Sequence, residues 1–166
     1  MENLIQKYLK ENNVEGKYGV DYRLEDSGNG IEIKSWKLSI EKPTFTQEEI
    51  ILDNAKAIKS VTLKLSRDEK LTGSIFTISV DQVDCAFYLR TVDLPILEAK
   101  IEDLPNNTDT KTWGDINGKR INLNKIFFIR IRNHIKANDE QIWDLYGEKL
   151  AEIESAPDLE ALEEID

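Results

Sequence analysis

Apolar residues recur at helical spacing near both ends of the chain. Residues 3–12 predict a short N-terminal helix with one apolar side, formed by Leu4, Ile5, Tyr8 and Leu9. A much longer helix is predicted to begin at Asn124, whose side chain can cap it, and to end before Pro157. Leu123 and Phe128 can form a hydrophobic staple around that cap. The broad apolar face of this helix comprises Phe128, Ile131, Ile135, Ile142, Tyr146, Leu150 and Ile153.

A third helix is predicted between Pro43 and Gly73. Two pairs of residues can form a capping box at its start, either Thr44 with Gln47 or Thr46 with Glu49. If it runs to about Leu71, with Gly73 as its C-cap, it is roughly 40 Å long at 1.5 Å per residue. Its apolar stripe has a heptad-like spacing and consists of Ile51, Ala55, Ile58, Thr62 and Leu65.

This stripe has two interpretations. A helix of this length could act as a connector or as an oligomerisation stem, with copies meeting through Ile51, Ala55, Ile58 and Leu65. Alternatively, the stripe packs on the helix of residues 125–154 within one chain.

Alternating apolar and polar residues predict two β-hairpins and one further strand. The first hairpin pairs residues 20–25 with 30–38 across the turn Asp26-Ser27-Gly28-Asn29-Gly30, in which glycine supplies a positive φ. The second has the turn Asn117-Gly118, one of the strongest short hairpin signals. The further strand is SIFTISV, at residues 74–80.

Residues 84–97 fit two kinds of secondary structure. Cys85, Phe87 and Leu89 alternate with other residues, which favours a strand. The whole span also suits a helix interrupted at Pro95, and a helix is our expectation here.

Together these elements predict an α+β protein in which small β-hairpins pack with two long helices, one of which could form a helical stem. We expect residues 1–43 to be an N-terminal helix and hairpin module. Residues 44–73 would form a connecting long helix, and residues 74–166 a C-terminal α+β domain.

Composition narrows the classes of function. The length of 166 residues suits one domain or two very small ones. The hydrophobic fraction of 40% is too high for a wholly disordered chain. There is no apolar run of about 18 residues and no secretory signal pattern, so we expect neither a membrane span nor export. Cys85 is the single cysteine, so an internal disulfide is excluded and a reducing compartment is favoured.

The net charge of −10 argues against binding nucleic acid through a basic face. The acid is concentrated at the C-terminal end, where Lys149 alone opposes Glu148, Glu152, Glu154, Asp158, Glu160, Glu163, Glu164 and Asp166. A solvated helix face explains this run, and a surface for a basic partner is the alternative.

No pattern of catalytic or metal-binding residues stands out. His134 is the only histidine and lies inside a predicted helix, where we interpret it as a surface or packing residue. A nucleophile pair of Cys85 and His134 would require the fold to bring them together. One cysteine and one histidine form no metal cluster, and no phosphate-binding, dinucleotide-binding or serine-hydrolase motif occurs. We therefore expect no catalytic, cofactor or metal site, and a binding or structural protein rather than an enzyme.

The first hairpin carries a resemblance to a known class of protein. The pattern Asp21-Tyr22-x-Leu24-x-Asp26-x-Gly28-x-Gly30, followed by Ile33, Trp36 and KPTFTQEE, resembles the start of small tail proteins of prophages and tailed phages. The rest resembles a domain of unknown function from tail-fibre-associated proteins. That second resemblance rests on the helix ending near Gly73, FTISVDQVD, TWGDINGKRINLN and the closing LAEIESAPDLEALEEID. The closing segment is also similar to tail-fibre assembly chaperones.

The resemblance implies a class of role. The chain would be a non-enzymatic phage or prophage tail protein that binds tail-fibre or baseplate components, as an assembly factor or a minor virion component. It would act in the bacterial host cytoplasm during assembly, and in the virion tail if it is retained there. No cofactor, nucleic acid or membrane is expected as a partner. A homo-oligomer follows only from the first of the two interpretations of the apolar stripe.

A protein that grips a partner needs exposed anchors, and aromatic residues on hairpins are good candidates. Trp36, Trp113 and Tyr22 are the predicted partner-binding residues. The alternative is that both tryptophans lie in the core under the helices. Trp143 is expected to serve in core or stem packing.

Two other functions compete with the tail protein. The first is an acidic phage effector that mimics DNA and inhibits a host DNA-binding protein. It rests on the net charge alone, and the clustering of acid at one end counts against it. The second is a hydrolase that uses Cys85.

Overall fold

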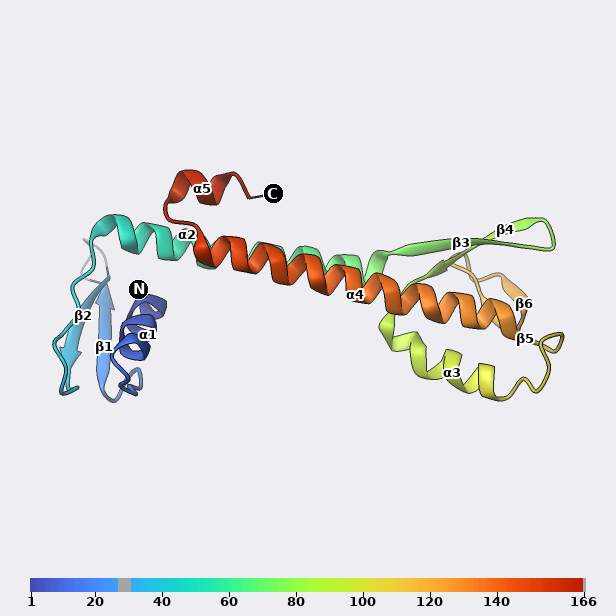
Figure 1. Cartoon of the computed structure of the whole chain (residues 1–166), viewed down its shortest axis with the longest axis horizontal. Helices are drawn as coiled ribbons and strands as arrows, with labels where there is room; N and C mark the ends of the chain where they lie inside the picture. Colours follow the sequence, from blue (N-terminus) through green and yellow to red (C-terminus); the bar gives the residue numbers. More distant parts are fainter. Residues whose placement is uncertain (27–30, 166) are drawn as a thin grey trace. The chain divides into compact units, whose positions relative to one another are not determined.

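The computed structural model describes residues 1–26 and 31–165 (Figure 1). Helices and small antiparallel hairpins are both present, which confirms the α+β class and the two long helices. The six strands pair as β1–β2, β3–β4 and β5–β6, in three separate two-stranded sheets. In chain order the elements are α1 (Glu2–Glu11), β1 (Tyr22–Asp26), β2 (Ile31–Trp36), α2 (Gln47–Gly73), β3 (Ile75–Val80), β4 (Val83–Tyr88), the 3₁₀ turn η1 (Thr91–Asp93), α3 (Leu94–Glu102), β5 (Thr110–Gly114), β6 (Arg120–Asn124), α4 (Lys125–Ser155) and α5 (Leu159–Glu163).

The chain divides into two compact units. The first contains residues 1–59 and 153–166, and the second contains residues 60–152. The division falls within α2 and within α4, so each long helix contributes to both units. The expected boundaries at residues 43/44 and 73/74 do not coincide with it.

The first unit is built around α1 and the β1–β2 hairpin. Ile5 and Leu9 of α1 and Tyr22 of β1 are almost completely buried, as the helical spacing of the N-terminal residues predicts for the α1 pair. The antiparallel pairing of β1 with β2 confirms the first predicted hairpin, whose turn residues 27–30 lie outside the described residues. The side chains that pack around this centre are Met1, Val14, Leu24, Ile33, Trp36, Leu38, Ile40, Phe45 and Ile50.

The start of α2 is fixed by the second of the two predicted capping boxes. The Glu49 backbone N–H donates to Thr46 Oγ1 at 3.2 Å, and the Thr46 N–H donates to Glu49 Oε2 at 2.7 Å. These reciprocal bonds satisfy two backbone donors at a helix end that has no intrahelical partners for them. At the other end, Gly73 is the last helical residue, and its φ is not positive. The helix therefore stops there without the left-handed glycine of the common C-cap motifs.

The second unit has its core between the β3–β4 hairpin, α3 and the first part of α4. Period-two alternation places Ile78, Val80, Cys85 and Phe87 on the same buried face of the hairpin. Each fully buried aliphatic or aromatic side chain contributes about 1.5–3 kcal/mol relative to exposure. The other buried members of this cluster are Leu89, Leu97, Ile101, Leu104, Leu123, Phe128, Ile131 and Ile135.

The expected helix over residues 84–97 is wrong for its first part. Residues 83–88 form strand β4, as the alternation of Cys85 and Phe87 indicates, and α3 begins only at Leu94. Pro95 lies in the first turn of α3. Backbone N–H groups in a first turn have no acceptor within the helix, so a proline, which lacks this N–H, loses no hydrogen bond there. Pro95 thus begins this helix rather than interrupting it.

The β5–β6 hairpin and the start of α4 follow the sequence signals closely. Gly118 has a φ of 77°, and the Asp115 carboxylate accepts bonds from the N–H groups of Asn117 and Lys119 at 2.9 and 2.7 Å. The predicted Asn124 cap is confirmed, because its Oδ1 accepts the N–H of Phe127 at 3.1 Å.

The last part of the chain belongs to the first unit. Ile153 of α4 and Leu162 of α5 are buried, and Asp158 caps α5 by accepting the N–H of Ala161 at 2.8 Å. The Nζ atoms of Lys56 and Lys59, on α2, donate to the carbonyl oxygens of Glu154 and Leu162. The acidic C-terminal segment is therefore attached to α2 through its backbone acceptors.

Replacing Thr46 by alanine removes one half of the capping box. We expect this change to lower the free energy of unfolding by about 1 kcal/mol, as measured by urea denaturation. Thr44→Ala is the matched control, because Thr44 belongs to the capping box that does not form. It should change stability by less than about 0.5 kcal/mol. Equal losses in the two variants would contradict this assignment of the cap.

Candidate functional site

The aromatic residues predicted to anchor a partner in the first unit belong to its core. Tyr22 is 0% exposed, and its hydroxyl accepts a 2.6 Å hydrogen bond from Gln6 Nε2. Trp36 packs with its ring centroid 5.9 Å from that of Tyr22 and donates its indole N–H to the Ile40 carbonyl at 2.8 Å. The expectation that Tyr22 presents an exposed anchor is wrong, because β1 turns this side chain toward α1. Trp36 follows the alternative interpretation, that of a core residue.

Trp113 in the second unit is packed in a similar way. Its ring meets Phe128 edge-on, with 6.0 Å between centroids, and Lys100 Nζ lies 5.7 Å from its centroid. Trp113 is partly buried against the second unit's core. Sequence spacing alone could not reveal this, since it does not show which face of a hairpin a helix covers.

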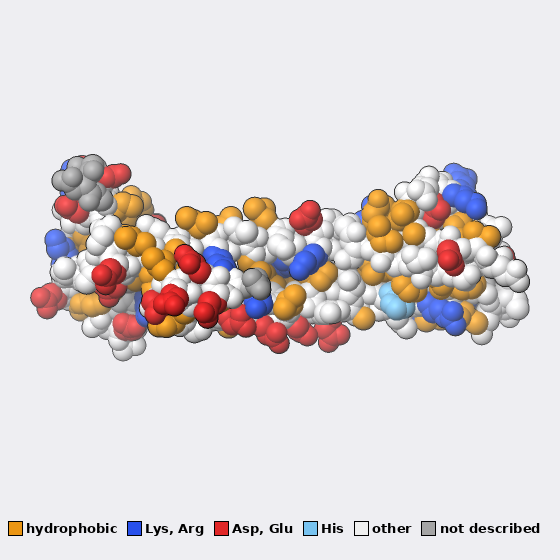
Figure 2. Space-filling model, turned by 90° about the horizontal axis from the view of Figure 1, so that it is seen from above, with side chains coloured by type: hydrophobic (Ala, Val, Ile, Leu, Met, Phe, Trp, Pro, Cys, Tyr) orange, Lys and Arg blue, Asp and Glu red, His pale blue; other side chains and the backbone are white. Residues whose placement is uncertain are grey.

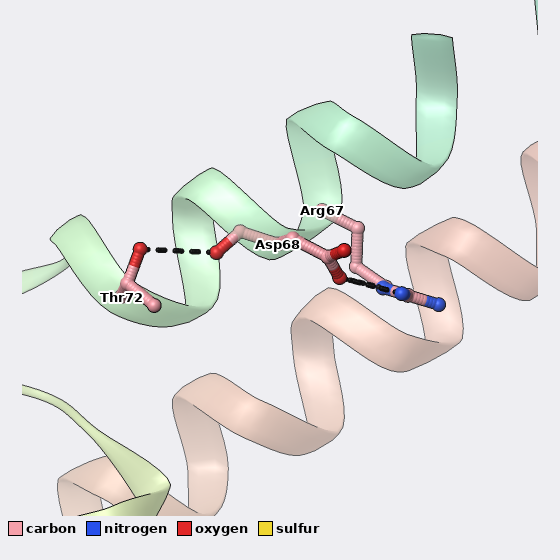
Figure 3. A network of polar contacts seen from close by, with 3 residues as sticks. All are labelled: Arg67, Asp68 and Thr72. Carbon is pink, nitrogen blue, oxygen red and sulfur yellow. Dashed lines mark hydrogen bonds and ion pairs between the residues drawn. The ribbon is translucent and has the colours of Figure 1, made fainter. Parts of the chain in front are cut away.

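Trp143, on α4, is half exposed and forms part of a contact between α4 and α2. The Arg67 guanidinium lies 4.4 Å from the Trp143 centroid and 4.5 Å from that of Tyr146. Figure 3 shows Arg67 extending from α2 toward α4, bonded to Asp68, while Thr72 Oγ1 donates to the Asp68 carbonyl at 3.1 Å. Asp68 thus holds a guanidinium that is already stacked on two aromatic rings. Trp143 therefore packs against α2 and not in the core, and its role in a helical stem stays a prediction.

The structure does not join the one cysteine to the one histidine. Cys85 is buried in the hairpin, where its Sγ lies 3.4 Å from the Val83 carbonyl oxygen as a weak donor. His134 is exposed and stacks on Phe76, with 3.8 Å between ring centroids. No hydrogen bond connects the two side chains in the part of the chain that the structure describes. That part also contains no group of three or more histidine, cysteine or acidic residues placed to hold a metal ion.

One surface carboxylate titrates away from its ordinary range. The hydrogen bond from Lys111, at 2.5 Å, and next the charge of Lys111 lower the pKa of Asp103. A lowered carboxyl pKa adds stability at neutral pH, and this contribution is lost as the pH falls through the folded-state value. Because the Asp103 side chain is exposed, this pair is a feature of the surface and does not mark a catalytic group.

Among the residues that the sequence predicts to bind a partner or to mediate oligomerisation, the apolar stripe on α2 contains the most exposed side chains. The exposed fractions of Ile58 and Leu65 are 69% and 65%, and Ile51 is also exposed, whereas Ala55 is half-buried. Exposure of the three larger residues does not fit the alternative in which the stripe packs on the 125–154 helix. Self-association through this stripe stays a prediction.

One exposed residue of this surface, Val61, is not part of the predicted stripe. Val61 is 60% exposed and lies three residues after Ile58 and four before Leu65, so it falls on the same helix face. Ile51 and Ile58 belong to the first unit, and Val61 and Leu65 to the second. A heptad count starting from Ile58 would have found Val61, since positions three and seven residues further on share a face. We call Val61 and Leu65, both in the second unit, the α2 stripe.

Acidic residues form a second exposed row in the second unit. Glu140, Asp144 and Glu148 follow one another at intervals of four residues along α4, and all three are exposed. Residues at this spacing are neighbours on a helix surface, so the row presents three carboxylates to solvent on one face. Figure 2 shows acidic side chains gathered in rows of this kind on the molecular surface.

None of the helices in the described residues is both long and apolar enough to span a membrane. Comparisons of the chain with protein-family models, with curated proteins and with solved structures gave no match.

Replacing Trp113 by alanine tests its role in the core. We expect the free energy of unfolding to fall by about 3 kcal/mol, because the ring that packs on Phe128 is lost. Trp113→Phe keeps an aromatic ring and should cost less than about 1.5 kcal/mol. Chemical denaturation followed by circular dichroism measures both. A Trp113→Ala protein as stable as the wild type would show that this side chain is not part of the core.

Arg67→Lys keeps the charge beside Trp143 and Tyr146 but removes the planar guanidinium. We expect a loss of about 0.5–1 kcal/mol, measured by urea denaturation, because an ammonium group stacks less well on aromatic rings. Arg120→Lys, at an exposed position on β6, is the matched control and should be neutral. If both substitutions cost the same, stacking does not contribute to the contact.

Proposed function

We propose that this chain is a non-enzymatic binding protein of a phage or prophage tail. It binds a tail-fibre or baseplate chain, as an assembly factor or a minor component of the virion. Its place of action is then the bacterial host cytoplasm during assembly, and the tail itself if the protein is retained. The resemblance of the opening motif, from Asp21 to Trp36, supplies the class of partner.

The exposure of the α2 stripe carries the binding part of this proposal. Val61 and Leu65 are each more than half exposed and lie one helical turn apart in the second unit. Leaving apolar side chains of this size in water forgoes stabilisation, and contiguous exposed patches on folded proteins commonly mark interaction sites. An amphipathic helix of the partner fits such a face through residues at intervals of three, four and seven.

This assignment moves the contact from the hairpin tryptophans to α2. Trp36 and Trp113 are partly buried against the cores of their units, which leaves only part of each ring accessible to a partner. Each hairpin packs within the core of its own unit, and the long helix presents the apolar side chains.

The acidic row on α4 is the observation that favours the effector as a second candidate. Three carboxylates at one-turn intervals could meet a basic groove on a host DNA-binding protein. Binding of that kind would weaken steeply as salt rises and would be lost when Glu140, Asp144 and Glu148 are neutralised.

Leu65→Asp places a charge on the α2 stripe and tests the proposal. The affinity-tagged protein is purified from cells that assemble the tail, and co-purifying chains are identified by mass spectrometry. We expect the wild type to retain a tail-fibre or baseplate chain and Leu65→Asp to lose at least ten-fold of it, because a charge is desolvated at an apolar contact. Val92→Asp is the matched control, since Val92 is 76% exposed and lies off the stripe.

Other outcomes separate the candidates. Recovery of host DNA-binding proteins in place of tail chains would favour the effector. A lower sedimentation mass for purified Leu65→Asp than for the wild type would assign the stripe to self-association.

A further inference from the structure

We propose that two copies of this chain associate through strand β3, edge to edge and antiparallel. The inference goes beyond the proposed function, because it concerns purified protein without a tail partner. It starts from the hydrogen bonds of the β3–β4 hairpin.

One edge of β3 has unpaired backbone groups. In the antiparallel register, Phe76 lies opposite Phe87 and Ile78 opposite Cys85, and the Leu89 N–H donates to the Ser74 carbonyl at 2.8 Å. Because bonded pairs alternate along such a ladder, even-numbered residues of β3 point their backbone groups toward β4. The N–H and C=O groups of Ile75, Thr77 and Ser79 therefore point outward. Within the described residues no strand pairs with β3 on that side.

The other edge of the same hairpin is partly covered. The Ile116 N–H, from the β5–β6 turn, donates to the outward-pointing carbonyl of Ala86 on β4 at 2.9 Å. This contact occupies one of the outward-pointing acceptors of β4. No comparable contact is made by the outward groups of β3 in the described part of the chain.

Strand β3 also lacks the features that usually protect an exposed edge. Edge strands are commonly guarded by charged residues, proline or a bulge. Each of the other five described strands carries at least one charged residue, whereas IFTISV carries none, contains no proline and pairs without a register shift. An unguarded edge of this kind is a template for pairing with another strand.

The face of the hairpin that is turned away from the core adds apolar surface. Ile75 and Tyr88 lie opposite each other on this face, and both are exposed. In Figure 2 hydrophobic side chains gather over the region that β3 and β4 occupy in Figure 1. A neighbouring strand would cover part of this surface as well as the open edge.

The occupant that this strand fits is a second copy. IFTISV carries no charged residue, so pairing it antiparallel with its own copy brings no like charges together along the strand. Antiparallel pairing about a two-fold axis at Thr77 sets Thr77 opposite itself and Ile75 opposite Ser79 of the second copy. The outward groups then make about six backbone hydrogen bonds, and no like charges face each other along the strand. The product is a continuous four-stranded sheet, which is more stable than an isolated two-stranded one.

Charge variants at Thr77 test this geometry, because the two-fold axis sets residue 77 opposite itself. We expect wild-type protein to sediment as a dimer, and Thr77→Lys and Thr77→Glu each to sediment as monomers, with dimerisation weakened at least ten-fold. An equimolar mixture of the two variants should restore a dimer, since opposite charges then face each other. The Thr77 side chain is exposed and its N–H points away from β4, so both variants should keep the wild-type circular dichroism spectrum.

Matched variants make each outcome decisive. Val92→Lys adds the same charge to the same unit away from β3 and should leave the dimer intact. Ser79→Lys replaces Thr77→Lys if the latter fails to fold, and should also give monomers. The proposal is overturned by a monomeric wild type, by a Thr77→Lys protein that dimerises normally, or by a mixture that stays monomeric. It is also overturned if Leu65→Asp, and not Thr77→Lys, abolishes the dimer.

Discussion

Each two-stranded hairpin needs a helix packed on one of its faces to be stable, and the rest of the structure follows from this requirement. A pair of strands has too little apolar surface to be stable alone in water, and the described residues form three such pairs in place of one larger sheet. In the first unit α1 covers the hairpin through Ile5 and Leu9, beside the buried Tyr22. In the second unit Phe128, Ile131 and Ile135 of α4 supply most of the helical surface of the core. Secondary structure and tertiary packing are therefore stabilised together, hairpin by hairpin.

This arrangement determines which side chains remain for contacts with other molecules. A hairpin that is covered on one face uses its large aromatic residues on that face, as Trp36 and Trp113 show. The opposite face, the strand edges and the outer sides of the helices stay accessible to other chains. The surfaces that we propose for interaction are therefore the aliphatic residues of α2 and the uncharged strand β3, rather than the tryptophans.

Local signals predicted much of the fold. The helix starts at Thr46 and Asn124, the turn at Asn117-Gly118 and the burial of Ile131 and Ile135 each depend on residues close together in the sequence. Such short-range interactions can be deduced from side-chain chemistry and periodicity without knowledge of the tertiary structure.

The features that were missed depend on the tertiary structure. The β3–β4 turn is formed by Asp81 and Gln82, both with positive φ, and a glutamine in this conformation gives no recognisable turn signal. Without that turn, the alternation at Cys85 and Phe87 could not be assigned to a hairpin. The inward orientation of Tyr22 is fixed by α1, which no pattern within β1 reveals. The candidate surfaces were harder to predict than the fold because exposure depends on which faces the helices leave uncovered.

Residue-resolved hydrogen exchange on β3 tests most directly whether a hairpin covered by helices on one face leaves the backbone groups of one strand edge unpaired. At protein concentrations too low for association, we expect slow exchange at the amides of Phe76, Ile78 and Val80, which are bonded to β4. The amides of Ile75 and Thr77, which point outward, should exchange much faster. Equal protection of the two sets in dilute protein would contradict the account, because it would mean that the outer edge of β3 is already covered within a single chain.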